Sequence, residues 1–279
     1  MKTLGYYNGK ISELEEMQVP MLDRACYFGD GVYDAALAHN YNIYCIDTHI
    51  NRFFNSARLM DINLPCSKEE LKETLNAMVH KMDDPDLFVY WQVSRGSALR
   101  NHVYPENMMG NLWIMIWPTK VSDKNRTLHL VTVEDTRFLH NNIKSINLIP
   151  AVRYATDAAR TGYDECLLHR DGRVTECAHS NLSILKNGCF YTAPTDEYIL
   201  PGIERKHLIE ACEINNILVK EIAFTLEDVM NADEIIVSSS SMLCLRVSDI
   251  NHQEVGGKDC KHFQLLQDYV FNKFEELCK

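Results

Sequence analysis

The stretch Asn141-Asn142-Ile143-Lys144-Ser145-Ile146-Asn147-Leu148-Ile149-Pro150 places one lysine among small polar and aliphatic residues. The alternating apolar residues of 128–133, just before it, predict a strand. The pattern of 151–160, just after it, predicts a helix that begins at a cap formed by Ser145 or Asn147. The proline that ends the quoted stretch suits the first turn of that helix. The lysine is therefore expected on a connection between a strand and a helix.

Apolar neighbours on both sides are expected to turn the Lys144 side chain inward. A partly desolvated lysine loses its charge more easily than an exposed one, and a neutral amine can form a Schiff base. The alternative is an ordinary surface lysine in a loop, because charged side chains are rarely buried. The rest of the chain has to decide between these two interpretations.

Composition excludes some classes of function. The chain has 279 residues, of which 46% are hydrophobic, enough for one large domain or two modest ones. Its net charge is −11 and it has no basic tract, which argues against a nucleic-acid partner. A small anionic ligand would need arginines placed locally.

The ten cysteines are scattered and include no Cys-x-x-Cys pair, which argues against a metal site or a redox motif. Reduced thiols of this kind are typical of a cytoplasmic protein. Because the N-terminus runs directly into a strand-like segment, we expect no signal peptide, and because no apolar run is long enough, we expect no membrane span.

The first half of the chain, residues 1–118, is predicted to form a smaller N-terminal α/β domain. The turn Asn8-Gly9 predicts a hairpin, and Ser67-Lys68-Glu69-Glu70 predicts a capping box at the start of a helix. The other expected elements are strands at 32–36, 41–46, 87–94 and 112–118, and a helix at 49–60 capped by Asp47 or Thr48.

Residues 119–126 are polar and are predicted to be an interdomain linker. Residues 127–279 are predicted to form a larger C-terminal domain that carries Lys144. Its expected elements are strands near 165–169, 181–186, 189–193, 218–222 and 234–238, and helices at 203–215, 226–230 and 260–276. Because both halves mix strands with helices, we expect a two-domain α/β or α+β fold.

Glu176 follows a turn and lies between two strand-like stretches. A buried glutamate requires a cationic partner, and the pyridinium nitrogen of pyridoxal phosphate requires a carboxylate to stay protonated. The alternative is a glutamate at the end of a strand. Two further segments could hold a phosphate: the Gly202-Ile203 start of a helix, whose N–H groups attract anions, and the hydroxyl run around Ser240.

Four more side chains could serve a charged ligand. Arg52 lies at the border of an apolar helical face, where it could grip phosphate oxygens or simply reach to solvent. Tyr33, Arg100 and His102 come from separate elements and could bind a substrate carboxylate. Each of these signals is common when taken alone.

Taken together and in order, the motifs resemble a known family. They are Tyr27-Phe28-Gly29-Asp30-Gly31-Val32-Tyr33, His49-Ile50-x-Arg52, Arg100-x-His102, Lys144-Ser145-Ile146-Asn147-Leu148, Val174-Thr175-Glu176 and Leu200-x-Gly202-Ile203. The chain is similar to the fold-type IV pyridoxal-phosphate enzymes, which include D-amino-acid aminotransferases, branched-chain aminotransferases and aminodeoxychorismate lyases. The Arg100-x-His102 pair makes it most similar to D-amino-acid (D-alanine) aminotransferases.

The resemblance implies a role for each motif residue. Lys144 would form the Schiff base with pyridoxal 5′-phosphate and shuttle the proton, and Glu176 would pair with the pyridinium nitrogen. The phosphate would be held by Arg52, the N–H groups of Ile203 and Glu204, and Ser240. Tyr33, Arg100 and His102 would bind the substrate carboxylate, the last two from the second subunit of a homodimer. The family fold places the cofactor between a smaller and a larger domain.

The implied reaction transfers the amino group of a D-amino acid, such as D-alanine, to a 2-oxo acid, such as 2-oxoglutarate, to give pyruvate and D-glutamate. The alternatives are a branched-chain or amine aminotransferase, a lyase of the same fold, or a non-catalytic binding module. The chain departs from the family in three places. They are Cys177-Ala178-His179-Ser180 where relatives have Gly and a serine run, Glu204 where a threonine is frequent, and Met242 where a polar residue is frequent.

Overall fold

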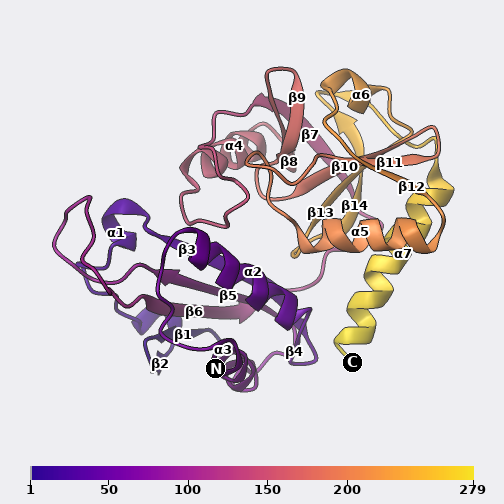
Figure 1. Ribbon diagram of the computed structural model, residues 1–279. Helices are drawn as coiled ribbons and strands as arrows, with labels where there is room; N and C mark the ends of the chain where they lie inside the picture. The colour runs from indigo at the N-terminus through magenta and orange to yellow at the C-terminus, as the bar shows by residue number, and fades with distance from the viewer. Residues whose placement is uncertain (1) are drawn as a thin grey trace. The chain divides into compact units, whose positions relative to one another are not determined.

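The computed structural model describes residues 2–279, which divide into two compact units (Figure 1). The first unit comprises the chain up to Val121 together with Ile143–Asn147 and Glu275–Lys279. The second comprises Ser122–Asn142 and Leu148–Phe274. The five-residue segment that contains Lys144 therefore packs with the first unit, while the chain on either side of it belongs to the second.

A six-stranded antiparallel sheet in the order β2-β1-β6-β5-β3-β4 forms the first unit. The predicted hairpin is confirmed, since Asn8 and Gly9 both have positive φ and join β1 to β2. The strands are β1 Leu4–Tyr7, β2 Lys10–Ser12, β3 Gly31–His39, β4 Asn42–Ile43, β5 Leu87–Ser94 and β6 Asn111–Pro118; two single turns are η1 Leu14–Glu16 and α1 Ala25–Phe28.

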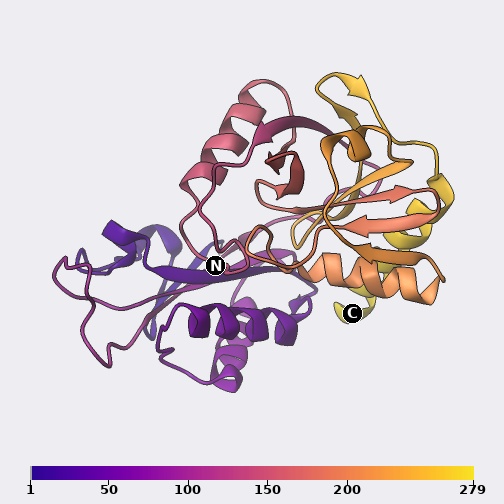
Figure 2. The ribbon, with the colours of Figure 1, turned by 45° about the horizontal axis from the view of Figure 1, so that its top comes forward.

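Helices α2 (Ile46–Leu59) and α3 (Lys68–Val79) lie on the same side of this sheet (Figure 2). They bury residues such as Phe53 and Leu75 against apolar side chains of β3, β5 and β6. The capping box at Ser67 is confirmed, because its side chain accepts from the Glu70 N–H and the Glu70 carboxylate accepts from the Ser67 N–H.

Two expectations for this region are wrong. The expected strand at 41–46 is only the two-residue β4, because the chain turns into α2 at Ile46. Neither Asp47 nor Thr48 caps α2: the cap position is Cys45, in the left-handed conformation, and it makes no side-chain capping bond. The helix thus begins before the two polar residues that were expected to cap it. Asp47 lies in its first turn, where a negative charge interacts favourably with the helix dipole.

A nine-stranded mixed sheet forms the second unit, in the order β12-β11-β10-β13-β14-β7-β8-β9 with β15 on β14. The Asn187-Gly188 hairpin is confirmed between β10 and β11. The strands are β7 Thr127–Glu134, β8 Glu165–Arg170, β9 Arg173–Cys177, β10 Asn181–Lys186, β11 Cys189–Thr192, β12 Leu218–Glu221, β13 Glu234–Ser239, β14 Leu243–Ile250 and β15 Gln253–Glu254. Residues 119–126 lie between β6 and β7, outside any helix or strand.

The helices of the second unit are α4 Ile149–Arg160, α5 Ile203–Ile214 and α6 Leu226–Met230, and α7 spans Cys260–Leu277. Helix α4 packs Ala151 and Ala158 against the Cys166 and Leu168 side chains of β8. Pro150 lies in the first turn as expected, but the expected cap is wrong. The cap position is Leu148, without a side-chain bond, because the Asn147 amide donates instead to the Gly29 carbonyl at 2.9 Å.

Each unit combines one sheet with helices, which confirms the expected mixed α/β architecture. Among residues 2–279, no helix is both long enough and apolar enough to cross a membrane.

Candidate functional site

Lys144 lies on an extended segment that hydrogen-bonds to the edge of β3. The Lys144 carbonyl accepts from the Tyr33 N–H at 2.9 Å, and the Ile146 N–H donates to the Gly31 carbonyl at 3.1 Å. The Lys144 N–H donates to Ser56 Oγ of α2 at 3.2 Å. Two hydrogen bonds of the Lys144 main chain and one of Ile146 therefore hold this segment against β3 and α2.

Gly31 is required by this close approach. A Cβ atom at Gly31 would lie 2.6 Å from the Val93 carbonyl oxygen and 3.0 Å from Ile146 Cδ1. No real side chain tolerates the first distance, so any other residue would push β3 away from β5 or from the lysine segment.

The Lys144 ammonium lies over the ring of Tyr33, with Nζ 4.5 Å from the ring centroid. The Tyr33 ring in turn stacks on Tyr90 at 5.4 Å. A cation above an aromatic face is held in place without an acidic partner. The structure thus brings together two of the residues singled out from the sequence, Lys144 and Tyr33.

Arg52 forms a fork-like ion pair with Asp34, whose side chain is fully buried. Arg52 Nε lies 2.9 Å from one carboxylate oxygen and Nη2 lies 2.7 Å from the other. The same carboxylate accepts from His49 Nδ1 at 2.7 Å. Asp34 therefore fixes the position of the Arg52 guanidinium. The sequence motifs did not single out Asp34, although an aspartate in an apolar strand indicates a cationic partner.

Charge in this cluster follows from burial and pairing. Burial by itself would raise the pKa of Asp34, but Arg52 and His49 outweigh it and the pKa is lowered. Burial lowers the pKa of His49 despite the Asp34 carboxylate, and the positive charges of Arg52 and Lys144 lower it further. At neutral pH the cluster is therefore a carboxylate, a neutral imidazole and a guanidinium.

Arg100 and His102 lie in an exposed loop between β5 and β6 and gather around one aromatic ring. The Arg100 guanidinium carbon lies 5.0 Å from the Phe28 ring centroid, and the His102 ring lies 5.1 Å from it. Arg24, which also stacks on Phe28, donates to the Asn101 carbonyl at 2.8 Å. The two predicted carboxylate ligands are thus brought close to each other in the first unit.

Glu176 lies at the end of β9 in the second unit and accepts hydrogen bonds on both oxygens. Oε1 accepts from Arg137 Nη1 at 2.7 Å. Oε2 accepts from Asn181 Nδ2 at 2.9 Å and from the Leu200 N–H at 3.0 Å. Burial raises the pKa of Glu176, and Arg137 and the Leu200 N–H act against that rise.

Arg137 is a residue that the sequence reasoning missed. Its guanidinium lies between Glu176 and the buried Asp135, whose Oδ2 accepts from Nη2 at 2.9 Å. Burial would lower the pKa of Arg137, but these two carboxylates raise it overall. The sequence did carry one indication of this pair: Asp135 and Arg137 come just after an apolar strand, and two opposite charges at the end of a strand indicate a buried ion pair.

Asn181 links Glu176 to the start of α5. Its amide also donates to the Leu200 carbonyl at 2.9 Å, and a Cβ atom on Gly202 would lie 1.8 Å from Asn181 Oδ1. Glycine at 202 is therefore needed for the α5 N-terminus to come this close to the residue that holds Glu176.

The first turn of α5 has no side-chain cap, because Gly202 occupies the cap position. The N–H groups of Ile203 and Glu204 are at this helix end, which carries a partial positive charge. The Glu204 carboxylate lies within its own helix, with Oε2 3.2 Å from His207 Nδ1. Ser240 is half-buried and lies in the turn directly after β13.

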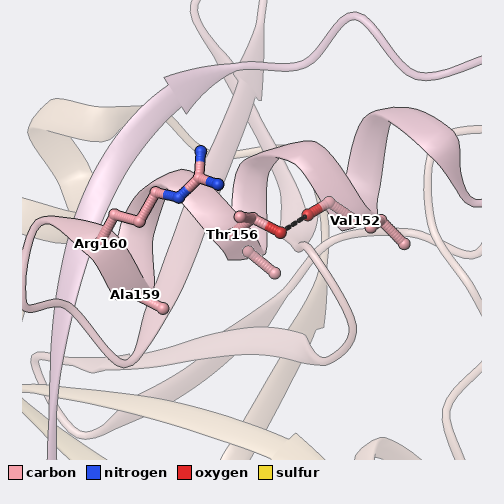
Figure 3. A pocket seen from close by; sticks show the side chains of 5 residues that line it. Val152, Thr156, Ala159 and Arg160 are labelled. Carbon is pink, nitrogen blue, oxygen red and sulfur yellow. Dashed lines mark hydrogen bonds between the residues drawn. The ribbon is translucent and has the colours of Figure 1, made fainter.

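One shallow depression lies on the surface of α4 and contains none of the predicted site residues (Figure 3). Its floor is an apolar face of the helix, where the Thr156 hydroxyl is turned back to the Val152 carbonyl at 2.7 Å. It is lined by Val152, Ala155, Thr156, Ala159 and Arg160. Such a surface offers contact area but no group for acid–base chemistry.

The family model for Amino-transferase class IV matches residues 31–250. The chain belongs to the class IV aminotransferases. It is 34% identical over 258 residues to a D-alanine aminotransferase of Bacillus licheniformis, covering 92% of this chain and 90% of that protein. This class IV aminotransferase is thus a transferase, and most of its sequence aligns with that relative.

Solved structures confirm the class IV fold. A branched-chain amino acid aminotransferase from Escherichia coli superposes with a TM-score of 0.89 at 20% identity, covering 100% of this chain and 96% of that one. A branched-chain aminotransferase from the archaeon Thermoproteus uzoniensis, solved with norvaline, gives a TM-score of 0.87 at 21% identity, covering 98% and 96%. At this identity the likeness concerns the fold.

The residues present fit pyridoxal phosphate, on which class IV aminotransferases depend. The second unit offers the Glu176 carboxylate for a ring nitrogen and an uncapped helix end at Gly202 for a phosphate. The first unit offers a lysine amine held over a tyrosine ring. No cluster of three or more metal-ligating side chains occurs within the described residues 2–279.

Proposed function

We propose that this enzyme carries out pyridoxal-phosphate-dependent transamination between a D-amino acid, such as D-alanine, and a 2-oxo acid, such as 2-oxoglutarate, forming pyruvate and D-glutamate. The 34% identity to a D-alanine aminotransferase over nearly the whole chain carries this proposal. The experiment that tests it is a product assay with both enantiomers of several amino acids, 2-oxoglutarate being the acceptor. Preferential turnover of L-leucine or of a primary amine would move the enzyme to a neighbouring subfamily.

When bound, the cofactor supplies the electron sink that makes the substrate Cα–H acidic. Lys144 is proposed to attach it and then to carry the proton, because hydrogen bonds fix its main chain and its amine lies over the Tyr33 ring. Arg52, the N–H groups of Ile203 and Glu204, and the Ser240 hydroxyl are proposed to hold the phosphate. Tyr33, Arg100 and His102 are proposed to bind the substrate carboxylate.

Glu176→Gln tests the proposed partner of the ring nitrogen. The amide keeps an oxygen to accept from Asn181 and Leu200, so the cofactor is expected to stay bound. Losing the carboxylate weakens the electron sink, and turnover at saturating substrate should fall at least about tenfold, or ~1.4 kcal/mol. Cofactor content by absorbance, read beside turnover, checks this. An unchanged rate would remove Glu176 from the role.

Arg100→Ala tests the proposed carboxylate ligand. A charged hydrogen bond contributes about 1.5–3 kcal/mol, so kcat/KM for D-alanine and for 2-oxo acids should fall about tenfold to a hundredfold. His102→Ala should show a smaller loss of the same kind, because a neutral imidazole donates one bond where guanidinium offers a charged fork.

The control for Arg100→Ala is a primary amine without a carboxylate, used as the amino donor. Its turnover should change little in the variant, since the deleted contact is one it never makes. Equal losses for donors with and without a carboxylate would show that Arg100 supports the loop instead.

We further propose that the enzyme is a homodimer in the cytoplasm. Apolar side chains near the Arg100 loop support a subunit contact there: Met21 is 89% exposed, Leu99 is 79% exposed and Val103 is 75% exposed. On the second unit, the exposed Ile149 and Val152 continue the apolar face of α4. Thiols buried in apolar cores, such as Cys166 and Cys212, suit a reducing compartment.

A further inference from the structure

Phe28, the last residue of α1, is a half-buried aromatic side chain to which the proposed reaction assigns no role. The exposed side chains of Arg100 and His102 both lie against its ring, at 5.0 Å and 5.1 Å from the ring centroid. Within residues 2–279, neither of these two side chains makes a hydrogen bond or an ion pair. The contact with the Phe28 ring is therefore the interaction that restrains them.

A ring holds an arginine differently from an acid or a carbonyl. A contact with an aromatic face uses none of the five N–H donors of a guanidinium. An arginine held by hydrogen bonds would have to give up some of them to bind a carboxylate, whereas Arg100 keeps its whole fork for the two carboxylate oxygens. Phe28 thus restrains the guanidinium without competing with a ligand.

The main chain of the Arg100 loop is fixed beside this ring. The Tyr27 hydroxyl donates to the Ala98 carbonyl at 2.6 Å. Arg24 Nη1 donates at 2.8 Å to the carbonyl of Asn101, the residue between the two proposed carboxylate ligands. Arg24 is itself buried, and its Nε lies 2.7 Å from the Asp30 carboxylate. The ring and the loop therefore share one rigid support.

The loop is also fixed beyond the two ligands, at Tyr104. The Tyr104 ring lies over the Arg95 guanidinium, with the guanidinium carbon 3.9 Å from the ring centroid. The Tyr104 hydroxyl donates to Asp61 Oδ2 at 2.8 Å. Arg95 is buried and donates to the Asp61 carbonyl at 2.7 Å. With the main chain held on both sides, the freedom that remains is in the two side chains that Phe28 contacts.

We propose that Phe28 is a positioning residue, which holds Arg100 and His102 together so that a substrate carboxylate meets a preformed pair. The proposal rests on the proposed carboxylate-binding function of that pair. A ligand that must first order long side chains binds more weakly than one that finds them ordered. Phe28 should therefore lower KM for substrates that carry a carboxylate without changing the chemical step.

Phe28→Leu, which keeps an apolar side chain but removes the aromatic face, is the primary test. KM for D-alanine and for 2-oxoglutarate should rise about fivefold, in keeping with the loss of a cation–π contact. Neither kcat nor KM for a primary amine donor should change. Phe28→Tyr keeps the face and should restore KM. The matched control is Phe54→Leu, since the Phe54 ring lies 5.7 Å from Lys68 Nζ in the same unit.

Side-chain NMR signals of Arg100 and His102 give a readout that needs neither substrate nor turnover. Nuclear Overhauser contacts from the Phe28 ring to both side chains should appear in the wild-type protein. In Phe28→Leu both signals should move toward those of unrestrained side chains, and in Phe28→Tyr they should stay.

Absent contacts in the wild type, unmoved signals in Phe28→Leu, or equal rises in KM for donors with and without a carboxylate would overturn the proposal. The proposed function of the pair fails by a different result, namely an Arg100→Ala variant whose KM for D-alanine is unchanged. In that case the NMR signals still decide whether Phe28 holds the two side chains.

Discussion

Lys144→Ala is expected to abolish transamination while leaving the fold intact. One amine is proposed to attach the cofactor and to move the proton, and general acid–base catalysis alone contributes about 10²–10⁴-fold. The contacts that seat this residue on β3 and α2 are made by its main chain, which alanine keeps. Turnover and the melting temperature, measured on the same preparation, check both halves of this expectation.

The matched control is Lys68→Ala, a lysine of the same unit whose ammonium donates to the exposed Asn51 side chain. It should retain turnover, which separates loss of the specific amine from loss of any positive charge. Near wild-type transamination by the Lys144 variant would contradict the central assignment of this site.

Asp34→Ala is expected to destabilise the protein strongly. The carboxylate is fully buried between Arg52 and His49, and removing one partner of such a pair costs about 3–5 kcal/mol. Urea unfolding followed by circular dichroism measures the change. Asp47→Ala is the control, because Asp47 is 70% exposed and its pair with Lys72 is worth about 0–1 kcal/mol. Similar losses in both variants would refute this account of Asp34.

The ion pair of Asp34 also makes the stability of the folded protein depend on pH. Because the pKa of Asp34 is lowered in the folded state, its contribution is complete above the unfolded pKa of about 3.9. That contribution is lost as the pH falls from there toward the folded pKa. The free energy of unfolding of Asp34→Asn should therefore fall less than that of the wild type when the pH is lowered from about 5 to about 2.

Local chemistry is what the sequence made predictable. The Asn-Gly hairpins at Asn8 and Asn187 and the capping box at Ser67 each depend on residues within four positions of one another. The sequence alone was therefore enough to predict them. The caps of α2 and α4 could not, because tertiary contacts decide them: Asn147, a good cap by its chemistry, is used by Gly29 instead.

The residues that pair with the site residues could not be predicted from the sequence, for a related reason. Arg137 and Glu176 are 39 positions apart, and Arg52 and Asp34 are 18 apart. No periodicity connects residues across such separations, so Glu176 and Arg52 could be named from motifs while their partners Arg137 and Asp34 could not.

The segment Ile143–Asn147 has a consequence for how the chain can be cut. It lies against Gly31 and Tyr33 as a short edge strand would, capping main-chain groups that would otherwise be open to another chain. A fragment that stops at Val121 would carry every strand of the first sheet yet leave this edge bare. Covering the edge and placing the Lys144 amine over Tyr33 are therefore one assembly event, and a synthetic peptide of this segment is the natural partner for such a fragment.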